Sequence, residues 1–404
     1  MPFVVFAAPL LSDNAFGMIE AVASLSGVQL AVITQDGAER LRQLTGRVAH
    51  WQVRDVLDVP QLLWAAGELQ VRHGNIHRLF GAFEHLQVPL AMVRQELGIS
   101  GMSVQAATNF RDKARMKTLL REAGLPCARH RLAGTVDDAV GFANVTGFPL
   151  VMKPPTGAGA VSTFRVDAMP QLLGALASAP PSPGNPVLLE EFIVGEEHSF
   201  ETISLNGKHV WHSLTHYYPT PLTVVENPWI QWSVVLPREV DAPQYDDIRV
   251  AARKALTVLG MQTGISHMEW FRRKDGSVAI SEVAARPPGA QITTLMSRAH
   301  DFDALHAWAR AMVFDEFTPP ERKYAVGAAY LRAQGHGRIV AVHGVEAVLR
   351  AVGDLIVEAR MPHIGAAPST SYEGDGFVIV RHPDTKRVEQ AVLTIVSNIR
   401  VELK

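Results

Sequence analysis

An Asp-Gly pair, Asp275-Gly276, lies between two short runs in which apolar and polar residues alternate. This pattern predicts a tight β-hairpin, because both central residues of a type I′ turn require positive φ and Asp-Gly accommodates it. Counting outward from a two-residue turn places Glu269 opposite Glu282 and His267 opposite Ala284. Side chains alternate between the two faces of a strand, so these four residues are expected on one face of the hairpin.

Two directly opposed carboxylates are an unusual feature in a hairpin. Their Cβ atoms would lie roughly 4.5–5.5 Å apart, and like charges in such positions are destabilising. A hard cation bound between the carboxylates, or a proton shared by them, would stabilise the pair. Arg286 follows the second run and offers a planar fork suited to phosphate or carboxylate. The alternative is a surface hairpin whose glutamates face water.

The composition is that of an ordinary globular protein. The chain has 404 residues, 47% of them hydrophobic and 19% charged, which suggests two to four domains. Its formal net charge of −2 offers no electrostatic reason to expect nucleic acid or an anionic membrane as a partner. Cys127 is the single cysteine, so we expect no intramolecular disulfide, and a cytoplasmic location fits.

The N-terminal region has the pattern of a parallel α/β unit. Phe3–Ala8 and Val28–Thr34 are predicted strands separated by a helix, and Ile76–Ala82 is predicted to continue their sheet. This order is typical of a doubly wound, Rossmann-like fold. Pro9 interrupts the first apolar run, and no basic region precedes it, so we expect a strand there and not a signal peptide. Uncharged apolar runs are also too short for a predicted membrane span.

The fold class that these patterns predict combines α/β and α+β units. We predict an N-terminal α/β domain at 1–103 and a lid-bearing subdomain at 104–186. A subdomain at 187–320 would contain the hairpin, and a small α+β domain would occupy 321–404. The last boundary is suggested by the proline-rich segment Phe317–Glu321, after which two helical patterns alternate with strands.

A glycine-rich loop follows the predicted strand that ends in Lys153. Small residues such as Gly157 and Gly159 let backbone N–H groups approach an anion, and Ser162 adds a hydroxyl. The loop is not a P-loop, because no Gly-Lys-Ser/Thr follows it. The alternative is a flexible connection without a ligand.

A second acidic segment begins with the apolar strand Val187–Glu191. This strand runs into Phe192 and Ile193, then Gly195 and further carboxylates that include Glu197. Backbone groups at such a strand end could contact the edge of a planar base, and a following carboxylate could accept hydrogen bonds from ribose hydroxyls. The alternative is a solvated acidic strand end.

Taken in order, these segments resemble the motif series of the ATP-grasp superfamily over about residues 100–300. The matching segments are Lys113 in FRDKARMK, Lys153 in FPLVMKPPTGAGA, EEFIVGEEHS at 190–199, and HMEWF…SEVAAR with Glu269, Glu282 and Arg286. The resemblance implies ATP held between two α+β subdomains, with the glycine-rich loop as a lid over it. It also implies an N-terminal Rossmann-like domain before the nucleotide clamp.

The resemblance further implies a role for each matching residue. Those expected to bind ATP are Lys113, Lys153, Gly157, Gly159, Ser162, Glu190, Glu191, Phe192, Ile193 and Glu197. Among these, the lysines would contact phosphates, residues 190–193 would line the adenine pocket, and Glu197 would hold the ribose. Glu269 and Glu282 would bind Mg²⁺, for which Mn²⁺ could substitute.

One departure from the common motif pattern points to a particular branch of the superfamily. Many members carry Glu-x-Asn in the second metal strand, whereas this chain has Ala284 two residues after Glu282. The branch of bacterial L-amino acid ligases of the bacilysin-synthetase type also lacks that asparagine, and its terminal domain resembles the segment 360–383. The implied reaction is ATP-dependent amide formation through an acylphosphate, with Lys153 and Arg286 as catalytic residues.

The same branch suggests where the substrates bind. The residues expected to wall the substrate site are His216, Tyr217, Glu226, Trp229, Arg286, Gly289 and Ala290. The small Ala290 would leave room for a larger substrate side chain. The alternative is that the aromatic segment 212–232 covers the core or forms a subunit interface.

Two other functional classes compete with an amino acid ligase. One is another ATP-grasp enzyme, either a bicarbonate-activating carboxylase or a purine-pathway ligase. The other is a nucleotide-binding protein without catalysis. The expected partners are a small carboxylate and a small amine, with neither nucleic acid nor membrane, and the superfamily suggests a homodimer.

Overall fold

The computed structural model describes residues 1–44, 48–156, 163–227 and 230–404. Its N-terminal unit is a four-stranded sheet in which every recorded strand pair is parallel, in the order β3-β2-β1-β4. The strands are β1 (Phe3–Ala8), β2 (Gln29–Thr34), β3 (Ala49–Gln52) and β4 (Ile76–Phe80). The accompanying helices are α1 (Asp13–Ala23), α2 (Val59–His73) and α3 (Gln87–Glu96). The predicted doubly wound opening is therefore confirmed.

The helical pattern over Asn109–Ala123 predicts one helix, but the structure contains two. Helix α4 (Val104–Arg111) ends at Asp112, whose backbone is extended, and α5 (Lys113–Glu122) begins directly after it. The Asp112 side chain accepts hydrogen bonds from two N–H groups in the first turn of α5, each at 3.0 Å. An N-cap of this kind satisfies donors that a helix start leaves free. The break places Lys113 at the start of a helix.

A small antiparallel sheet follows, in the order β5-β8-β6-β7. Its strands are β5 (His130–Ala133), β6 (Leu150–Lys153), β7 (Phe164–Val166) and β8 (Val187–Glu191), with helices α6 (Val136–Thr146) and α7 (Met169–Ser178). Apolar residues of these helices and strands share one buried cluster. Strand β8 belongs to this sheet, although the predicted subdomain boundary at 186 and 187 precedes it.

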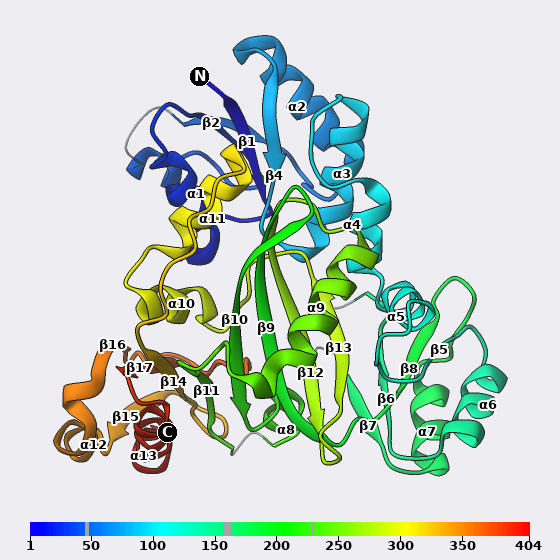
Figure 1. Cartoon of the computed structure of the whole chain (residues 1–404), viewed down its shortest axis with the longest axis vertical. Coiled ribbons are helices and arrows are strands. Elements are labelled where there is room, and N and C mark those ends of the chain that lie inside the picture. Colours follow the sequence, from blue (N-terminus) through cyan, green and yellow to red (C-terminus); the bar gives the residue numbers. More distant parts are fainter. Residues whose placement is uncertain (45–47, 157–162, 228–229) are drawn as a thin grey trace.

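The largest sheet has eight antiparallel strands in the order β13-β12-β9-β10-β11-β14-β17-β16. Its members are β9 (Gly195–Leu205), β10 (Lys208–Tyr218), β11 (Trp232–Leu236), β12 (Gly264–Arg273), β13 (Val278–Ala284), β14 (Ala325–Leu331), β16 (Ile356–Arg360) and β17 (Gly376–His382). Strands β14, β16 and β17 of the predicted C-terminal domain thus continue the sheet that carries the hairpin, so this sheet crosses the predicted boundary at residue 320 (Figure 1).

Shorter elements complete the chain. The helices are α8 (Pro221–Glu226), α9 (Asp246–Leu259), α10 (Ile292–His300), α11 (Ala304–Phe314), α12 (Val345–Val352) and α13 (Thr385–Asn398). Strands β15 (Ile339–His343) and β18 (Arg400–Leu403) form a separate pair. The 3₁₀ turns are η1 (Arg40–Gln43), η2 (Glu84–Leu86), η3 (Pro243–Tyr245) and η4 (Gly353–Leu355).

The hairpin has the predicted partners but not the predicted turn. Glu269 lies opposite Glu282 and His267 opposite Ala284, as expected. The tip, however, pairs Arg273 with Ser277 through an N–H to carbonyl hydrogen bond of 2.9 Å, so the turn contains three residues and not two. A register shift after Glu269 compensates for the extra residue. Gly276 has a φ of 83°, as expected for a three-residue hairpin loop that ends in a left-handed glycine.

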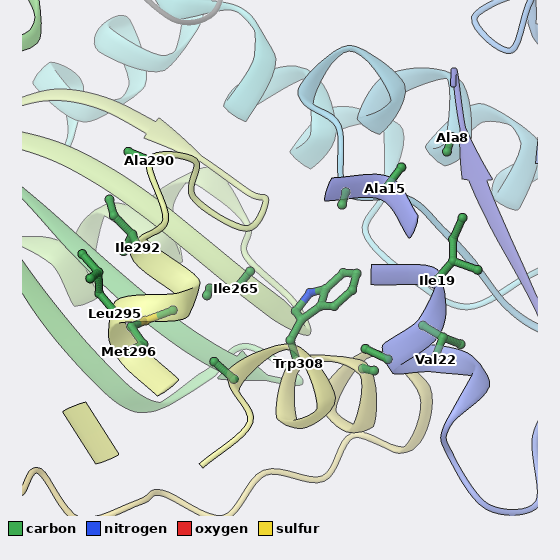
Figure 2. Close-up of a cluster of buried hydrophobic side chains, with 14 of the residues drawn as sticks. Ala8, Ala15, Ile19, Val22, Ile265, Ala290, Ile292, Leu295, Met296 and Trp308 are labelled. Carbon is green, nitrogen blue, oxygen red and sulfur yellow. The ribbon is translucent and has the colours of Figure 1, made fainter. Parts of the chain in front are cut away.

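One apolar cluster joins the N-terminal unit to the rest of the chain. Trp308 of α11 packs edge-on against Phe6 and Phe80, with ring centroids 6.5 and 5.7 Å apart. Figure 2 shows its indole between α1, with Ile19, and the strand that carries Ile265. A buried aromatic side chain of this size contributes roughly 1.5–3 kcal/mol through burial. Helix α11 therefore joins the N-terminal unit to the start of the hairpin strand β12.

Candidate active site

Strand alternation separates two chemically different faces on the sheet of β9, β10, β12 and β13. The pairs that lie directly opposite each other include His267 with Glu201 and Glu269 with Ser199. The side chains of one face are Glu197, Ser199, Glu201, Ser213, Thr215, Tyr217, His267, Glu269, Phe271, Glu282 and Ala284. We call this set the charged face.

A cavity of about 410 Å³ lies over the charged face. Its wall contains many of the side chains predicted from the sequence: Lys113, Lys153, Glu190, Glu191, Phe192, Ile193, Glu197, Tyr217, Glu269, Glu282, Arg286, Gly289 and Ala290. They come from α5, the small sheet, the large sheet and the loop after β13. The structure therefore brings together residues that are up to 177 positions apart between Lys113 and Ala290.

Two predicted substrate residues lie elsewhere, and four predictions fall outside the described residues. His216 neighbours Tyr217 on β10, so alternation directs it to the opposite face of the sheet, and it does not line the cavity. Glu226 is exposed at the end of α8 and does not line the cavity either. The expectation that these two side chains form the cavity wall is corrected. Gly157, Gly159, Ser162 and Trp229 belong to the residues that the structure does not describe.

The two carboxylates of the hairpin have different partners. Lys113 Nζ donates to Glu282 Oε1 at 2.6 Å, whereas Glu269 Oε1 lies 3.7 Å from His267 Nε2. Burial alone would raise the pKa of Glu282, but the cations of Lys113 and Lys153 lower it to about 2. Glu282 is therefore ionised at neutral pH, as a metal ligand must be.

A buried ion-pair cluster lies at the end of the small sheet. Lys153 Nζ is 3.0 Å and Lys117 Nζ 3.4 Å from the same oxygen, Glu190 Oε1. Lys117 also donates to the carbonyl of Ser281 at 2.6 Å, which ties α5 to β13. Burial lowers the pKa of Lys117, whereas for Lys153 the effect of burial is overcome by Glu190 and Glu282, which raise its pKa. Lys117, which is not among the predicted site residues, thus helps to hold the Glu190 carboxylate in position through an ion pair.

His267 is buried between two carboxylates. Its Nδ1 is 2.8 Å from Glu201 Oε1, and the other ring nitrogen faces Glu269. Burial would lower the pKa of this imidazole, but the hydrogen-bonded Glu201 and the nearby carboxylate of Glu269 raise it to about 9. Thr215 Oγ1 donates to the second oxygen of Glu201 at 3.2 Å. The charged face therefore holds a cation directly beside one of the predicted metal ligands.

Glu197 is buried on the same face. Burial and the neighbouring Glu269 raise the pKa of this carboxyl well above its usual range. A protonated or strongly perturbed carboxyl on the wall of a cavity marks a place where a ligand with hydroxyl groups or positive charge is favourable.

The donor set of the hairpin fits a hard divalent cation. Glu269 and Glu282 face the same cavity from adjacent strands and supply oxygen atoms, which Mg²⁺ prefers. Position 284 is an alanine and supplies none. Among the described residues, no group of three or more His, Cys, Asp or Glu side chains is arranged to hold a metal. Phosphate and water oxygens would therefore have to complete the coordination, as is usual for Mg²⁺.

Arg286 is held by a carboxylate that the sequence analysis missed. Its Nε donates to Glu84 Oε2 at 3.2 Å, and Arg111 donates to Glu84 Oε1 at 3.0 Å. Lys113 Nζ lies 4.0 Å from the same Oε1 atom. Glu84 is buried on η2 of the N-terminal unit. The N-terminal unit thus orients the arginine of the cavity, and no local sequence pattern around Glu84 indicates this role.

Residues of the C-terminal part also contribute to the cavity wall and support it. Tyr372 lines the cavity and packs edge-on against Trp232, with ring centroids 4.9 Å apart. Glu373 accepts a hydrogen bond from the N–H of Ala290 at 3.1 Å. Tyr330 donates its hydroxyl to the carbonyl of Ala290, whose φ of 53° is rare for a side chain with a Cβ. The loop that carries Ala290 is therefore held in place from both sides.

Comparison with known proteins agrees with this site. The family model described as an ATP-grasp domain matches residues 118–301. The L-arginine-specific L-amino acid ligase of Bacillus subtilis is 23% identical over 261 residues, which cover 62% of this chain and 62% of that protein. The carbamoyl phosphate synthase large chain of Caldanaerobacter subterraneus subsp. tengcongensis is 25% identical over 226 residues, which cover 55% of this chain and 20% of that protein. The match thus spans less than two thirds of the length of these curated relatives.

The architecture also resembles a solved structure over the whole chain. The crystal structure of an L-amino acid ligase from Bacillus licheniformis aligns with a TM-score of 0.78 and 18% identity, and the alignment covers 100% of this chain and 99% of that one. At this identity the similarity shows a shared fold. Among the described residues, no helix combines the length and apolar character that a bilayer crossing requires.

Proposed function

Because residues 118–301 of this chain are an ATP-grasp domain, we propose that the protein is an ADP-forming carbon–nitrogen ligase that joins a carboxylate to an amine. Amino acids or closely related molecules are the proposed substrates. The observation that carries this proposal is the single cavity in which Lys113, Lys153, the Glu269–Glu282 pair and Arg286 meet. Each of these groups has a task in phosphoryl transfer to a carboxylate.

The proposed reaction has two steps. A carboxylate oxygen of the first substrate attacks the γ-phosphorus of ATP, the bond from phosphorus to the β,γ-bridging oxygen breaks, and an acylphosphate and ADP result. The amine nitrogen of the second substrate then attacks the acyl carbon, phosphate leaves with the bond electrons, and the amine loses a proton. The products are an amide, ADP and phosphate. No side chain has to form a covalent bond to the substrate.

The main requirement is neutralisation of charge on the transferring phosphoryl group. Lys153 and Lys113 place two buried cations at the cavity wall, at present paired with Glu190 and Glu282. Glu269 and Glu282 would hold Mg²⁺, which supplies further positive charge to the phosphates when it is bound. Arg286 is oriented by Glu84 and is the proposed donor to the oxyanion of the tetrahedral intermediate.

The substrate end of the cavity suggests a small carboxylate with an apolar or aromatic part. Tyr217, Trp232, Ala290, Ile292 and Tyr372 line this end. Apolar walls with a few oriented polar groups are typical of small-molecule sites. The glycine-rich loop is proposed to close over ATP and to exclude water, which would otherwise hydrolyse the acylphosphate. Mg²⁺, a homodimer and a cytoplasmic location stay predictions.

The test is ADP release from Mg·ATP with pools of amino acids, each supplied alone and then in pairs. Release that requires two pools, together with a condensed mass in the products, is the expected result. Deconvolution of the active pair then identifies both substrates. Thermal stabilisation by ATP without ADP release under any substrate mixture would contradict the catalytic proposal and support a nucleotide-binding protein.

The similarity to a carbamoyl phosphate synthase large chain supports a second candidate. In that case the activated carboxylate would be bicarbonate. ADP release that depends on bicarbonate and does not respond to amino acids would favour this alternative. The apolar substrate end around Tyr372 favours a larger carboxylate, because bicarbonate offers no apolar surface to it.

A further inference from the structure

A second cavity of about 230 Å³ lies on the other side of Arg286. It is formed between the end of the N-terminal unit, from β4 to Met102, and the beginning of β12. Arg286 lines both cavities, so this second space adjoins the proposed site. Trp308, which packs against Phe80 of the N-terminal sheet, forms part of its wall.

Arg94 of α3 is an uncompensated cation in the wall of this second cavity. The residue is 6% exposed, and in the described part of the chain no carboxylate lies within 4.0 Å of its guanidinium. Its Nη1 and Nη2 donate to the carbonyls of Leu79 and Met102 at 3.0 and 2.8 Å. Its buried Nε has no hydrogen-bond partner. That Nε faces Gly101, so it is not the atom that a ligand would reach. A guanidinium carries two N–H donors on each terminal nitrogen, and the carbonyls of Leu79 and Met102 take one from each, so the second N–H of Nη1 and of Nη2 is left for a ligand.

The position of Arg94 depends on a glycine. A Cβ at residue 101 would lie 2.8 Å from Arg94 Nε, closer than van der Waals contact permits, and Gly101 avoids this conflict. Burial lowers the pKa of Arg94 to about 10, which leaves it charged at neutral pH. A buried charge without a partner is costly, and a bound anion would remove that cost.

The other charged groups in the second cavity are already paired. Arg78 donates to Asp315 Oδ2 at 2.7 Å, and Arg286 donates to Glu84. The remaining wall is mixed. Its apolar side chains are Phe80, Met102, Met261, Ile265, Trp308 and Met312, and its uncharged polar side chains are Gln87, Ser100, Asn206, Gln262 and Thr263. One unpaired cation near the side chains of Phe80, Ile265 and Trp308 matches a ligand that has one carboxylate and an apolar body.

We propose that the second cavity binds a small monocarboxylate with an apolar body, whose carboxylate accepts hydrogen bonds from Arg94. The occupant is either an amino acid substrate of the proposed ligase or an effector that is not consumed. Both have the same recognition chemistry, a carboxylate at Arg94 and apolar groups against Trp308. The site is distinct from the nucleotide cavity and does not require ATP for binding.

The test is calorimetric titration of the full chain, without nucleotide, with 4-methylpentanoate, its neutral amide 4-methylpentanamide, and L-leucine at constant ionic strength. We expect the carboxylates to bind and the amide not to bind. Arg94→Met should weaken binding at least about tenfold, because a hydrogen bond to a charged group is lost. Arg350→Met, at an exposed position of α12, is the matched control and should bind as the unchanged protein does.

Ser100→Trp keeps the proposal testable if Arg94→Met does not fold. Ser100 is exposed at the rim of the second cavity, so a bulky side chain there should block entry without removing a buried contact. Thermal stabilisation by ATP must persist in both variants as evidence of an intact nucleotide cavity. Absence of carboxylate binding, or equal affinity in the unchanged protein and in both folded variants, would overturn the proposal.

A final comparison separates the two sources of the ligand. With Mg·ATP present, consumption of leucine that is lost in the Ser100→Trp variant would identify a substrate. A change in the rate of ADP release without consumption of the carboxylate would identify an effector. Because carboxylate binding is measured without nucleotide, the calorimetric result can be interpreted even if the proposed ligase reaction does not occur.

Discussion

The two faces of the sheet formed by β9, β10 and β12 shift the pKa of a histidine in opposite directions. On the charged face, His267 lies between Glu201 and Glu269, and its pKa is raised to about 9. On the other face, which packs under α9 and η3, burial lowers the pKa of His216 to about 4. His216 is hydrogen-bonded to the hydroxyls of Tyr218 and Tyr245, at 3.3 and 3.0 Å, and lies beside the ring of His198.

This comparison shows that burial alone does not decide the charge of a side chain. Burial acts to lower the pKa of both imidazoles, and the difference lies in their neighbours. The carboxylates of Glu201 and Glu269 lie beside His267, whereas the described partners of His216 are two tyrosine hydroxyls. Period-two alternation sorts the residues, because neighbours such as His216 and Tyr217 must face opposite sides. The charged face can therefore bind ions, and the other face serves as core.

Removal of a carboxylate from the charged face should cause the largest change, a loss of ADP release. Glu282→Gln keeps the shape of the side chain but removes the charge that pairs with Lys113 and that would bind Mg²⁺. We expect ADP release to fall by more than about 100-fold, because even residues that only support a metal ligand contribute 10–100-fold. Steady-state ADP assays and circular dichroism check activity and fold. Glu346→Gln, on the exposed surface of α12, is the control, and equal turnover in both variants would contradict the metal assignment.

His216, on the face opposite the charged face, should lower the free energy of unfolding when the pH becomes acidic. The folded pKa of His216 is about 4 and its ordinary value is 6.5, so the unfolded chain binds a proton that the folded chain excludes between these values. Stability should therefore fall as pH falls through this window, and the contribution is fully present above pH 6.5. From pH 7 to pH 5 the loss is about 2 kcal/mol for this residue.

His216→Gln should make this acid limb shallower by about that amount. Urea unfolding at pH 7 and pH 5 measures the difference, and His336→Gln at an exposed position is the control. His198 remains in both proteins. Burial is the main cause that lowers its pKa to about 3, and His216 lowers it further, so the His216→Gln variant also removes that smaller contribution. An unchanged difference between the two pH values would show that His216 titrates normally in the folded protein.

A change at the substrate end should alter specificity and leave the nucleotide end intact. Tyr372→Ala removes an aromatic wall of the cavity that packs against Trp232. We expect the KM for the carboxylate substrate to rise about tenfold, since apolar contacts of this kind contribute 1–3 kcal/mol to discrimination. The KM for ATP should stay unchanged. A rise in the KM for ATP alone would place Tyr372 at the nucleotide and not at the second substrate.

The smallest expected effect is on stability, and it comes from removing a hydrogen bond to Glu201 on the charged face. Thr215→Val removes the hydroxyl that donates to Glu201, while the buried volume stays nearly the same. We expect the free energy of unfolding to fall by about 1 kcal/mol, the usual contribution of a buried hydrogen bond. Urea titration measures it, with Thr257→Val on the exposed side of α9 as the control. Equal stability of the two variants would show that Glu201 is held by His267 alone.

The hairpin illustrates how a correct prediction can rest on a wrong detail. The Asp-Gly signal located the turn, and the carboxylates do face each other. The turn nevertheless has three residues, and a register shift after Glu269 restores the predicted pairing. Period-two alternation predicts the face of the sheet on which each side chain lies. It does not predict a bulge, because a bulge depends on the pairing with the neighbouring strand.

The error at His216 could have been avoided from the sequence. It was expected to share a wall with Tyr217, although alternation places adjacent strand residues on opposite faces. In contrast, no sequence signal was available for Glu84 or Tyr372. Both enter the cavity region from units that are far away in the chain, and each acts through a contact made only after those units pack together.

The sequence by itself determined the local elements and the face of the hairpin on which chemistry occurs. Apolar periodicity, the Asp-Gly turn and the caps act over a few residues, so they can be recognised without knowledge of the fold. The ordered lysines and carboxylates were likewise sufficient to indicate the superfamily. The tertiary structure decided which charges are paired and which are left unpaired. Arg286 with Glu84, Lys117 with Glu190, and the uncompensated Arg94 all depend on distances between separate units, and a linear pattern contains no information on such distances.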